Sequence, residues 1–394
     1  MTIGHGRVEP KRVEPKRVER KDVGTVEDLH ASATKITGLT DFGTDDYLEG
    51  LQVLLESYAR DARLTPLGNK VKRAFLRGAL VARLLSESAW KQYPEHADVA
   101  IERPIFVTGL PRTGTTALHR LLTADPAHQG LQMWLTEVPQ PRPPRETWAD
   151  NPIFQGIQAA YEQHHVEHPE FMGLHYMSAD MVEECWQLLR QSMTSISYEC
   201  LAFLPTYSSW LDGRDWTDAY LRHKRNLRLI GLPDAEKRWV LKNPSHLFAL
   251  DALFEAYPDA LVIQTHREPR VAMASVCSLA ENASAGWSEL YRGEVVGRAQ
   301  LDLWARGLDS FMAARAKRDP QRFYDVDYGD FVADPIGTVE AIYGHFGLPL
   351  TEAASASMSA LHTESRSGAQ KPSHRYALSD FGLTPEMVDA RFAR

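Results

Sequence analysis

The sequence is poor in cysteine and contains no long apolar run. Its three cysteines, at positions 185, 200 and 277, stand far apart and form no CxxC pair. This spacing excludes a disulfide framework and is typical of unpaired thiols in a reducing compartment. No apolar run approaches the roughly 18 residues that a membrane helix needs, and the basic N-terminus lacks the apolar stretch of a signal peptide. We therefore expect a cytoplasmic protein without a membrane span.

The chain also lacks an excess of positive charge. Its 52 acidic residues outnumber 44 lysines and arginines, which gives a formal net charge of -8. Generic nucleic-acid binding requires a basic face, so this balance argues against a nucleic-acid partner. It remains compatible with a local basic pocket for an anionic cofactor.

The N-terminal quarter of the sequence divides into two parts. A VEPKR unit repeats with a period of five in residues 7–20, where prolines and alternating charges oppose helix formation. We expect a disordered charged tail over residues 1–24. Apolar residues then recur at helical spacing, which predicts an N-terminal helical region over residues 25–100.

Short apolar segments that lead into helical stretches follow from residue 101 onward. Three of them are Ile105–Thr108, Trp239–Leu241 and Ala260–Thr265. Repeated β-then-α units imply a parallel sheet covered by helices. Residues 140–235 are aromatic-rich and mostly helical in period, and we expect them to cover the carboxyl ends of the strands, where α/β sheets bind ligands. The predicted fold class is α/β, a P-loop-type sandwich over residues 101–394 with a central parallel sheet, an N-terminal helical layer and a large helical insertion.

The segment GLPRTGTT, residues 109–116, has the spacing of a phosphate-binding loop. It matches the Walker A pattern GxxxxGK[ST], except that Thr115 stands where the pattern has lysine. Successive backbone N–H groups and a following helix N-terminus still favour an anion. Arg112, inside the loop, supplies the missing positive charge. The sequence therefore predicts an anion-binding loop.

The residues around this loop argue against a kinase. The loop lysine that contacts the β- and γ-phosphates is absent, and the strand ends deliver Lys242 and Arg267 where a Walker B motif would place an acid. His164, His165 and His168 share a short stretch, but no acid or cysteine is spaced to complete a metal site. A cationic, metal-free site suits a donor with a single phosphate and a sulfate.

The stretch PIFVTGLPRTGTTALHRLL, residues 104–122, resembles the 5′-phosphosulfate loop of the sulfotransferase family. It is most similar to the bacterial branch that writes PRTGTT or PRSGTT in this loop. The resemblance implies 3′-phosphoadenosine 5′-phosphosulfate (PAPS) as the donor, with Arg112 at its bridging oxygen. The other loop residues that would hold the phosphosulfate are Pro111, Thr113, Gly114, Thr115 and Thr116.

Two further segments carry the resemblance, which covers residues from about 100 to 394. Arg267 follows a strand and Ser275 lies on the next helix, an arrangement similar to the family's 3′-phosphate site. The segment KPSHRY is similar to the closing segment of the bacterial branch. It would bring Lys371, His374 and Arg375 to the cofactor's phosphates, although it could also be a solvated turn.

Transfer of a sulfuryl group needs cations at the leaving phosphate and a base at the acceptor. Arg112 and Lys242 are the predicted cations. His246 is the first candidate base, because cytosolic sulfotransferases place a lysine and their catalytic histidine at an analogous strand end. Here two extra residues separate the pair, and His246 could instead cap a helix; Glu137 is the second candidate. Candidates for lining the acceptor pocket are His175, Glu183 and Glu184.

The sequence thus predicts a PAPS-dependent sulfotransferase that acts on a hydroxyl or amine of a small-molecule, glycan or lipid acceptor. No metal is expected, a glycolipid is one open acceptor class, and a homodimer is an open oligomeric state. One alternative is a P-loop nucleotide or small-molecule kinase, which the missing loop lysine opposes. Another is a catalytically inactive anion-binding module, which the joint presence of Arg112, Lys242 and a base opposes.

Overall fold

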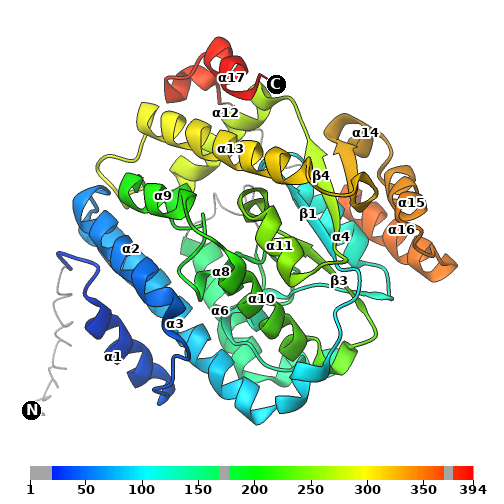
Figure 1. The fold of residues 1–394 in the computed structure, drawn as a ribbon, viewed down its shortest axis with the longest axis horizontal. Coiled ribbons are helices and arrows are strands. Elements are labelled where there is room, and N and C mark those ends of the chain that lie inside the picture. The colour runs from blue at the N-terminus through cyan, green and yellow to red at the C-terminus, as the bar shows by residue number, and fades with distance from the viewer. Residues whose placement is uncertain (1–19, 168–176, 368–375, 394) are drawn as a thin grey trace, which may run out of the picture.

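A computed structural model describes residues 20–167, 177–367 and 376–393 of the chain. Figure 1 shows the first helices along one side of the molecule and the sheet on the opposite side, with the helices of the middle of the chain between them. Most of the expected charged tail lies outside the described residues.

The centre of the fold is one five-stranded sheet. Its strands lie in the order β2-β3-β1-β4-β5, and every neighbouring pair is parallel. This arrangement confirms the predicted α/β class with a central parallel sheet. The strands predicted from apolar runs correspond to β1, β3 and β4, whereas β2 is very short and β5 alternates apolar with acidic residues. The bounds are β1 (Ile105–Gly109), β2 (His128–Gln129), β3 (Arg238–Lys242), β4 (Leu261–His266) and β5 (Phe323–Asp327).

Helices cover both faces of the sheet (Figure 1). In the described ranges the α-helices are α1 (Val26–Thr37), α2 (Leu48–Arg60), α3 (Pro66–Gln92), α4 (Thr115–Thr123), α5 (Met133–Glu137), α6 (Pro152–Glu167), α8 (Trp186–Arg190), α9 (Pro205–Asp212), α10 (Thr217–Ile230), α11 (Leu250–Ala256), α12 (Pro269–Ala283), α13 (Glu294–Arg315), α14 (Tyr328–Ala333), α15 (Pro335–Phe346), α16 (Glu352–Ser367) and α17 (Pro385–Phe392). The 3-10 helices are η1 (Asp45–Tyr47), η2 (Pro94–Asp98), η3 (Arg145–Asp150), η4 (Glu199–Leu201), η5 (Leu232–Asp234), η6 (Pro244–Phe248), η7 (Pro320–Arg322) and η8 (Leu378–Phe381).

The central strand β1 is buried at every residue. Because successive side chains of a strand point to opposite faces, Phe106 packs into the core that includes the N-terminal helices and the insertion. Ile105 and Val107 pack on the other face, beneath α4 and α15. Burial on both faces explains why this strand appears in the sequence as a continuous apolar run.

Helices α1, α2 and α3 form the N-terminal layer. Thr25 caps the start of α1 through its side chain, and Gly38 ends that helix with a left-handed φ of 71°. Thr65 caps α3, whose first position is occupied by Pro66, a residue that needs no hydrogen-bond partner for its nitrogen there. α1 packs along α3, and α3 contacts α8 and α10. The layer is therefore attached to the middle of the chain.

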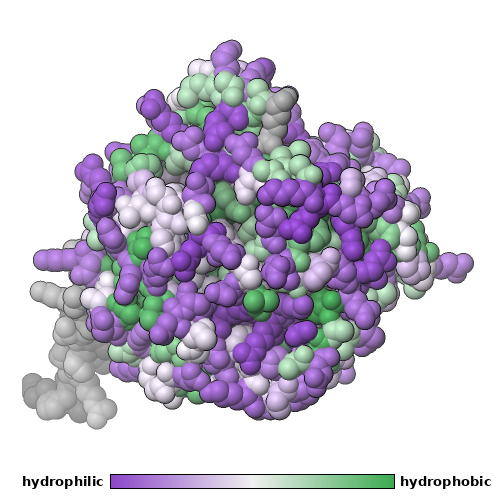
Figure 2. Space-filling model, in the orientation of Figure 1, coloured by the Kyte–Doolittle hydropathy of each residue, from purple (hydrophilic) through white to green (hydrophobic). Residues whose placement is uncertain are grey.

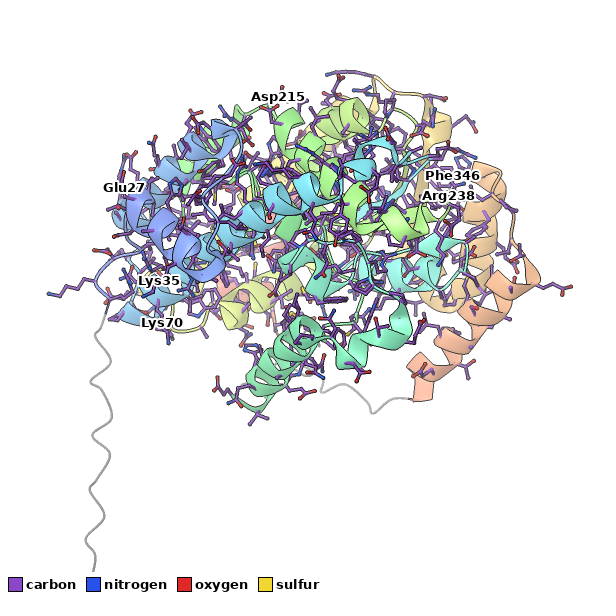
Figure 3. All side chains as sticks on the ribbon, turned by 90° about the horizontal axis from the view of Figure 1, so that it is seen from below. Glu27, Lys35, Lys70, Asp215, Arg238 and Phe346 are labelled. Carbon is purple, nitrogen blue, oxygen red and sulfur yellow. The ribbon has the colours of Figure 1, made fainter. Side chains whose placement is uncertain are left out.

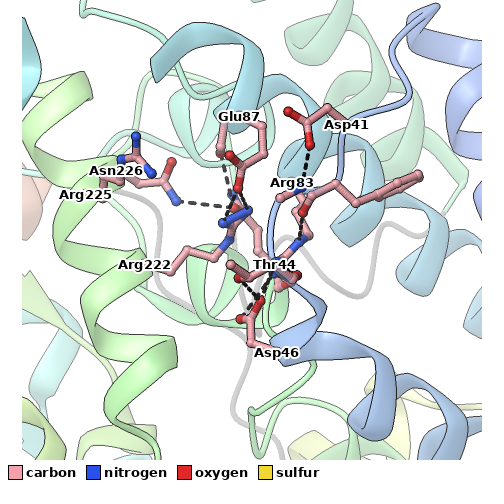
Figure 4. A network of polar contacts seen from close by, with 12 residues as sticks. Asp41, Thr44, Asp46, Arg83, Glu87, Arg222, Arg225 and Asn226 are labelled. Atoms are coloured by element: carbon pink, nitrogen blue, oxygen red, sulfur yellow. Dashed lines mark hydrogen bonds and ion pairs between the residues drawn. The ribbon is translucent and has the colours of Figure 1, made fainter. Parts of the chain in front are cut away.

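A polar network joins this layer to α10 (Figure 4). Arg83 of α3 is fully buried, pairs with Asp46, and donates Nη1 to the carbonyl oxygen of Gln191 at 3.0 Å. Arg222 of α10 donates both terminal nitrogens to one oxygen of Glu87, at 2.7 Å each. Because a buried guanidinium is tolerated only with such partners, these contacts fix α3 against α10.

The predicted insertion, residues 140–235, lies between β2 and β3 in the chain. It supplies α6, α8, α9 and α10 within the described ranges. Just before α8, the amide of Cys185 donates to the carbonyl oxygen of Lys242 at 3.1 Å. This contact places the insertion at the carboxyl end of β3.

The surface seen in Figure 2 is dominated by hydrophilic residues, with small apolar areas between them. Figure 3 shows Glu27, Lys35 and Lys70 at the periphery of the N-terminal helices. In the part of the chain that the structure describes, no helix is both long and apolar enough to cross a membrane.

Candidate functional site

The anion loop connects β1 directly to α4. Gly109 has a φ of 145°, and a Cβ built there would lie 2.5 Å from the carbonyl oxygen of Thr265 on β4. Gly114 has a φ of 90° and forms the N-cap of α4, so both positions favour glycine. Arg112 also has a positive φ, 70°, which is uncommon for a residue with a side chain and is found at functional loops.

Side-chain contacts hold the loop in this shape. Thr113 Oγ1 lies 2.5 Å from Thr265 Oγ1 of β4. Arg267 donates Nη1 to the carbonyl oxygen of Arg112 at 2.9 Å. Arg112 in turn donates Nε to Ser275 Oγ at 3.1 Å. The structure thus brings together the loop arginine and both residues of the predicted 3′-phosphate site.

Lys242 ends β3 and is fully buried beside the loop. Its Nζ donates to Thr116 Oγ1 at 3.2 Å and forms an ion pair with Glu184 Oε1 at 2.6 Å. Glu184 belongs to the insertion and directly precedes the Cys185 amide that bonds to the same lysine's carbonyl group. A buried ammonium group requires such a partner, so one cation and one carboxylate are fixed next to the loop.

His246 lies apart from these residues, in the core. Its Nδ1 is 2.6 Å from the Tyr220 hydroxyl, and its ring meets Phe106 edge-on with centroids 5.0 Å apart. Burial holds the pKa of this imidazole well below its usual range. Two cavities adjoin the anion loop, of about 840 and 220 Å³, and His246 lines neither of them. A base must come within about 3 Å of the proton it removes, so this position does not favour His246 as the base.

Glu137, the second candidate base, ends α5. It accepts a hydrogen bond from the Tyr161 hydroxyl at 2.9 Å. Burial raises the pKa of its carboxyl group, as is common at active sites, but Glu137 also borders neither cavity at the loop. The candidate residues His175, Lys371, His374 and Arg375 lie outside the described residues.

The structure describes two of the three clustered histidines. His164 and His165 lie in the last turn of α6 with ring centroids 6.2 Å apart, and His168 lies outside the described ranges. Within those ranges, no group of three or more His, Cys, Asp or Glu is placed to hold a metal ion.

Arginines line a cleft of about 840 Å³ at the loop. Arg112, Arg120 and Arg267 contribute to it, and its described lining contains no Asp or Glu. The guanidinium carbon of Arg267 lies 4.2 Å from the ring centroid of Tyr328. The buried Nε of Arg120 has no hydrogen-bond partner among the described residues, although the carboxylate of Glu183 is near enough to act on this guanidinium group. In a chain of net charge -8, this local excess of positive charge favours an anionic ligand.

A second cavity, of about 220 Å³, shares Arg112, Thr115 and Thr116 with the cleft. Glu184 is the one carboxylate in its described lining. Most of its remaining surface is apolar and includes Trp186, Ile196, Leu201, Val276, Leu279 and Trp304. A cavity with this lining suits a ligand with an apolar body and few polar groups.

Two residues of the site carry little signal in the sequence, and a third, Glu184, is predicted there only to line the acceptor pocket and not to pair with Lys242. Arg120 lies one helical turn beyond Thr116, so a helical projection of α4 could have placed it beside the loop. Tyr328 follows β5, a strand without an apolar run. Glu184 is far from Lys242 in the chain, and their contact depends on how the insertion folds.

Comparisons with known proteins all point to one family. Residues 104–352 match a family model described as the sulfotransferase family. The ω-hydroxy-β-dihydromenaquinone-9 sulfotransferase Stf3 of Mycobacterium bovis is 29% identical over 266 residues. The match covers 64% of this chain and 64% of that protein. The Mycobacterium tuberculosis protein of the same name gives the same values. The crystal structure of sulfotransferase STF1 from Mycobacterium tuberculosis H37Rv has a TM-score of 0.89 and 63% identity, covering 95% of this chain and all of that one. STF9 from Mycobacterium avium has a TM-score of 0.85 and 27% identity, with 97% of each chain covered.

Proposed function

Because the chain belongs to the sulfotransferase family, we propose that it transfers the sulfuryl group of PAPS to a hydroxyl group of an apolar acceptor. One observation carries this proposal: the arginine-lined cleft and the apolar cavity meet at Arg112, Thr115 and Thr116. An anionic donor in the cleft and an apolar acceptor in the cavity would meet at these three residues.

The side chains at the cleft fit a donor with two phosphates and a sulfate. The start of α4 offers backbone N–H groups to the 5′-phosphosulfate. Arg267 of the cleft would hold the 3′-phosphate together with Ser275, which lines neither cavity but is hydrogen-bonded to Arg112 of the loop. Arg120 adds a buried Nε without a described partner, which an anionic oxygen would satisfy. The roles of Pro111, Thr113, Gly114, Lys371, His374 and Arg375 stay predictions.

The cations would stabilise the leaving group. As the S–O bond to the donor's phosphate breaks and the S–O bond to the acceptor forms, negative charge collects on the phosphate oxygen. Arg112 lies in the loop that would hold this oxygen, and Lys242 is fixed against Thr116 at the start of α4. Charges that are held in place before the reaction need no reorganisation during it, which is the source of their catalytic effect.

We place the general base at Glu184 rather than at His246 or Glu137. Glu184 lines the apolar cavity, where the acceptor hydroxyl would sit, and the other two candidates do not. Its ion pair with Lys242 fixes the carboxylate close to the loop. The acceptor's proton would pass to Glu184 as the hydroxyl oxygen attacks sulfur.

The lining of the cavity favours an acceptor with an apolar body. Trp186, Leu279 and Trp304 would pack against such a body, whereas an unmodified sugar would leave its hydroxyl groups without partners. The similar M. bovis protein is named for a hydroxylated dihydromenaquinone. We therefore propose a hydroxyl-bearing lipid or aromatic compound as the acceptor class.

Calorimetric titration with adenosine 3′,5′-bisphosphate tests the donor site. The wild-type protein should bind this product without added metal, and Arg267→Ala should raise the dissociation constant about 10- to 100-fold because a charge-assisted phosphate contact is lost. The matched control is Arg318→Ala, which removes an arginine paired with Asp251 at 2.7 Å away from the cleft.

Two results would contradict this function. Preference for Mg²⁺-ATP over the bisphosphate would indicate a kinase, and equal binding by wild type and Arg267→Ala would remove the 3′-phosphate site. Once donor binding is established, transfer from PAPS is measured to a hydroxylated isoprenoid quinone and to a free sugar. Sulfation of the sugar alone would overturn the assignment of an apolar acceptor.

A further inference from the structure

A tyrosine from the C-terminal segment, residues 376–393, reaches the predicted 3′-phosphate site. The Tyr376 hydroxyl donates to Ser275 Oγ at 2.9 Å. The same oxygen accepts the Nε–H of Arg112 at 3.1 Å. Ser275 is only 4% exposed, so its hydroxyl group joins three separate parts of the chain: the anion loop, α12 and the C-terminal segment.

The direction of these hydrogen bonds determines whether the Ser275 hydroxyl group can still donate its proton to a ligand. A guanidinium group has no acceptor atom, so Arg112 can only donate. With Tyr376 donating as well, both lone pairs of the serine oxygen are occupied. Among the described residues the serine proton finds no acceptor, because the side chain of Ser275 forms no hydrogen bond there beyond these two. An anionic oxygen from a ligand would complete the arrangement.

Contacts with α12 and α13 fix the C-terminal segment in place. Arg270 of α12 donates Nε to Asp389 of α17 at 2.7 Å. Phe381 of η8 is 3% exposed and lies so close to α13 that a Cβ built on Gly297 would overlap its carbonyl oxygen. Tyr376 precedes η8 by two residues. Tyr376 itself is 36% exposed, and the packed segment that begins two residues later holds it near Ser275.

We propose that Tyr376 is a positioning residue for donor recognition, which orients the Ser275 hydroxyl so that its proton points to the donor's 3′-phosphate. The inference rests on the proposed function, because it takes Ser275 to lie at the 3′-phosphate. Tyr376 donates one hydrogen bond to the Ser275 oxygen, so it acts by orienting that hydroxyl group and not by attracting the phosphate. Its effect should appear only with ligands that carry a 3′-phosphate.

A comparison of two nucleotides isolates this effect. Dissociation constants are measured by calorimetry for adenosine 3′,5′-bisphosphate and adenosine 5′-monophosphate, with wild type, Tyr376→Phe, Ser275→Ala and the double variant. Tyr376→Phe should weaken binding of the bisphosphate about 3- to 10-fold, the range for one hydrogen bond, and leave the monophosphate unchanged. In the Ser275→Ala background the same substitution should have less than about a 2-fold effect, because the residue it acts through is gone.

Tyr324→Phe is the matched control, since that tyrosine lies on β5 and packs against His345 with ring centroids 5.2 Å apart. It should leave both dissociation constants unchanged. Equal weakening of both nucleotides by Tyr376→Phe, or a full effect that persists in the Ser275→Ala background, would overturn the inference. If wild type binds the bisphosphate no better than the monophosphate, the proposed donor site fails first and the inference fails with it.

Discussion

The positive charge of the buried Lys242 ammonium group is balanced by one carboxylate. The lysine is fully buried, and its ion pair with Glu184 is 2.6 Å long. Thr116 accepts a second hydrogen bond from the same Nζ but carries no charge to balance it. Removing one partner of a buried pair leaves the other charge uncompensated, and this costs more than the pair itself contributes. Lys242 and Glu184, which we propose as catalytic residues, therefore also contribute to the free energy of unfolding.

We expect Glu184→Gln to lower the free energy of unfolding by about 3 kcal/mol, the lower end for a broken buried pair, because the glutamate side chain is 23% exposed. Urea denaturation measures the change. The double variant Glu184→Gln with Lys242→Met should recover most of it, since no uncompensated charge remains. Glu236→Gln, at an exposed position, is the control and should change the stability little. A double variant as unstable as the single one would show that the ion pair is not the cause.

Among the elements, β1, β3 and β4 could be predicted from the sequence because strands buried on both faces are continuous apolar runs. β5 could not be predicted in this way, because Asp325 interrupts its run of apolar residues. That aspartate pairs with Arg315 of α13 and His266 of β4, at 2.6 and 2.7 Å, and both partners become visible only in the fold. The anion loop follows a local pattern, and the candidate roles of Arg267 and Ser275 follow from the family resemblance. The contacts of Glu184 with Lys242 and of Tyr376 with Ser275 depend instead on packing between segments distant in the chain.

The contact between α13 and η8 leads to a prediction about helix glycines. A Cβ at Gly297 would overlap the Phe381 carbonyl oxygen, so Gly297→Ala should displace η8 and destabilise the protein by about 1–3 kcal/mol. Gly344 of α15 has no atom within 4 Å of the corresponding position, and Gly344→Ala should stabilise by about 0.5–1 kcal/mol through helix propensity. Thermal unfolding distinguishes the two variants. Stabilisation by both would show that α13 and η8 are not in close contact in solution.

On the scale of the whole molecule, the N-terminal layer shares its interior with the rest of the chain. Lys72 of α3 is fully buried, and its Nζ donates to the carbonyl oxygen of Leu201 in the insertion at 3.0 Å. The same Nζ lies 4.8 Å from the ring centroid of Trp287, in the segment after α12. Three parts of the chain thus meet at one amino group. Whether the layer and the sheet domain unfold together can be followed through this group.

Burial lowers the pKa of Lys72 to about 7, from 10.5 for a solvated lysine. Between these values the unfolded chain holds a proton that the folded chain has lost, so this lysine makes the free energy of unfolding rise with pH from about 7 to 10.5. The rise approaches about 1.4 kcal/mol per pH unit within that window.

Lys72→Met removes this titration. We expect its stability advantage over wild type, measured by urea denaturation, to be largest below pH 7 and to shrink by about 1 kcal/mol per unit from pH 7 up to pH 9.5. Lys70→Met, on the same helix but exposed, should stay parallel to wild type throughout (Figure 3). Lys72 takes up a proton only when the region around it unfolds. If the protein unfolds in a single transition and that transition shows the expected pH dependence, the N-terminal layer unfolds together with the sheet. If the difference between Lys72→Met and wild type is the same at every pH, the amino group is not buried in solution, and the layer packs less closely on the insertion than the structure describes.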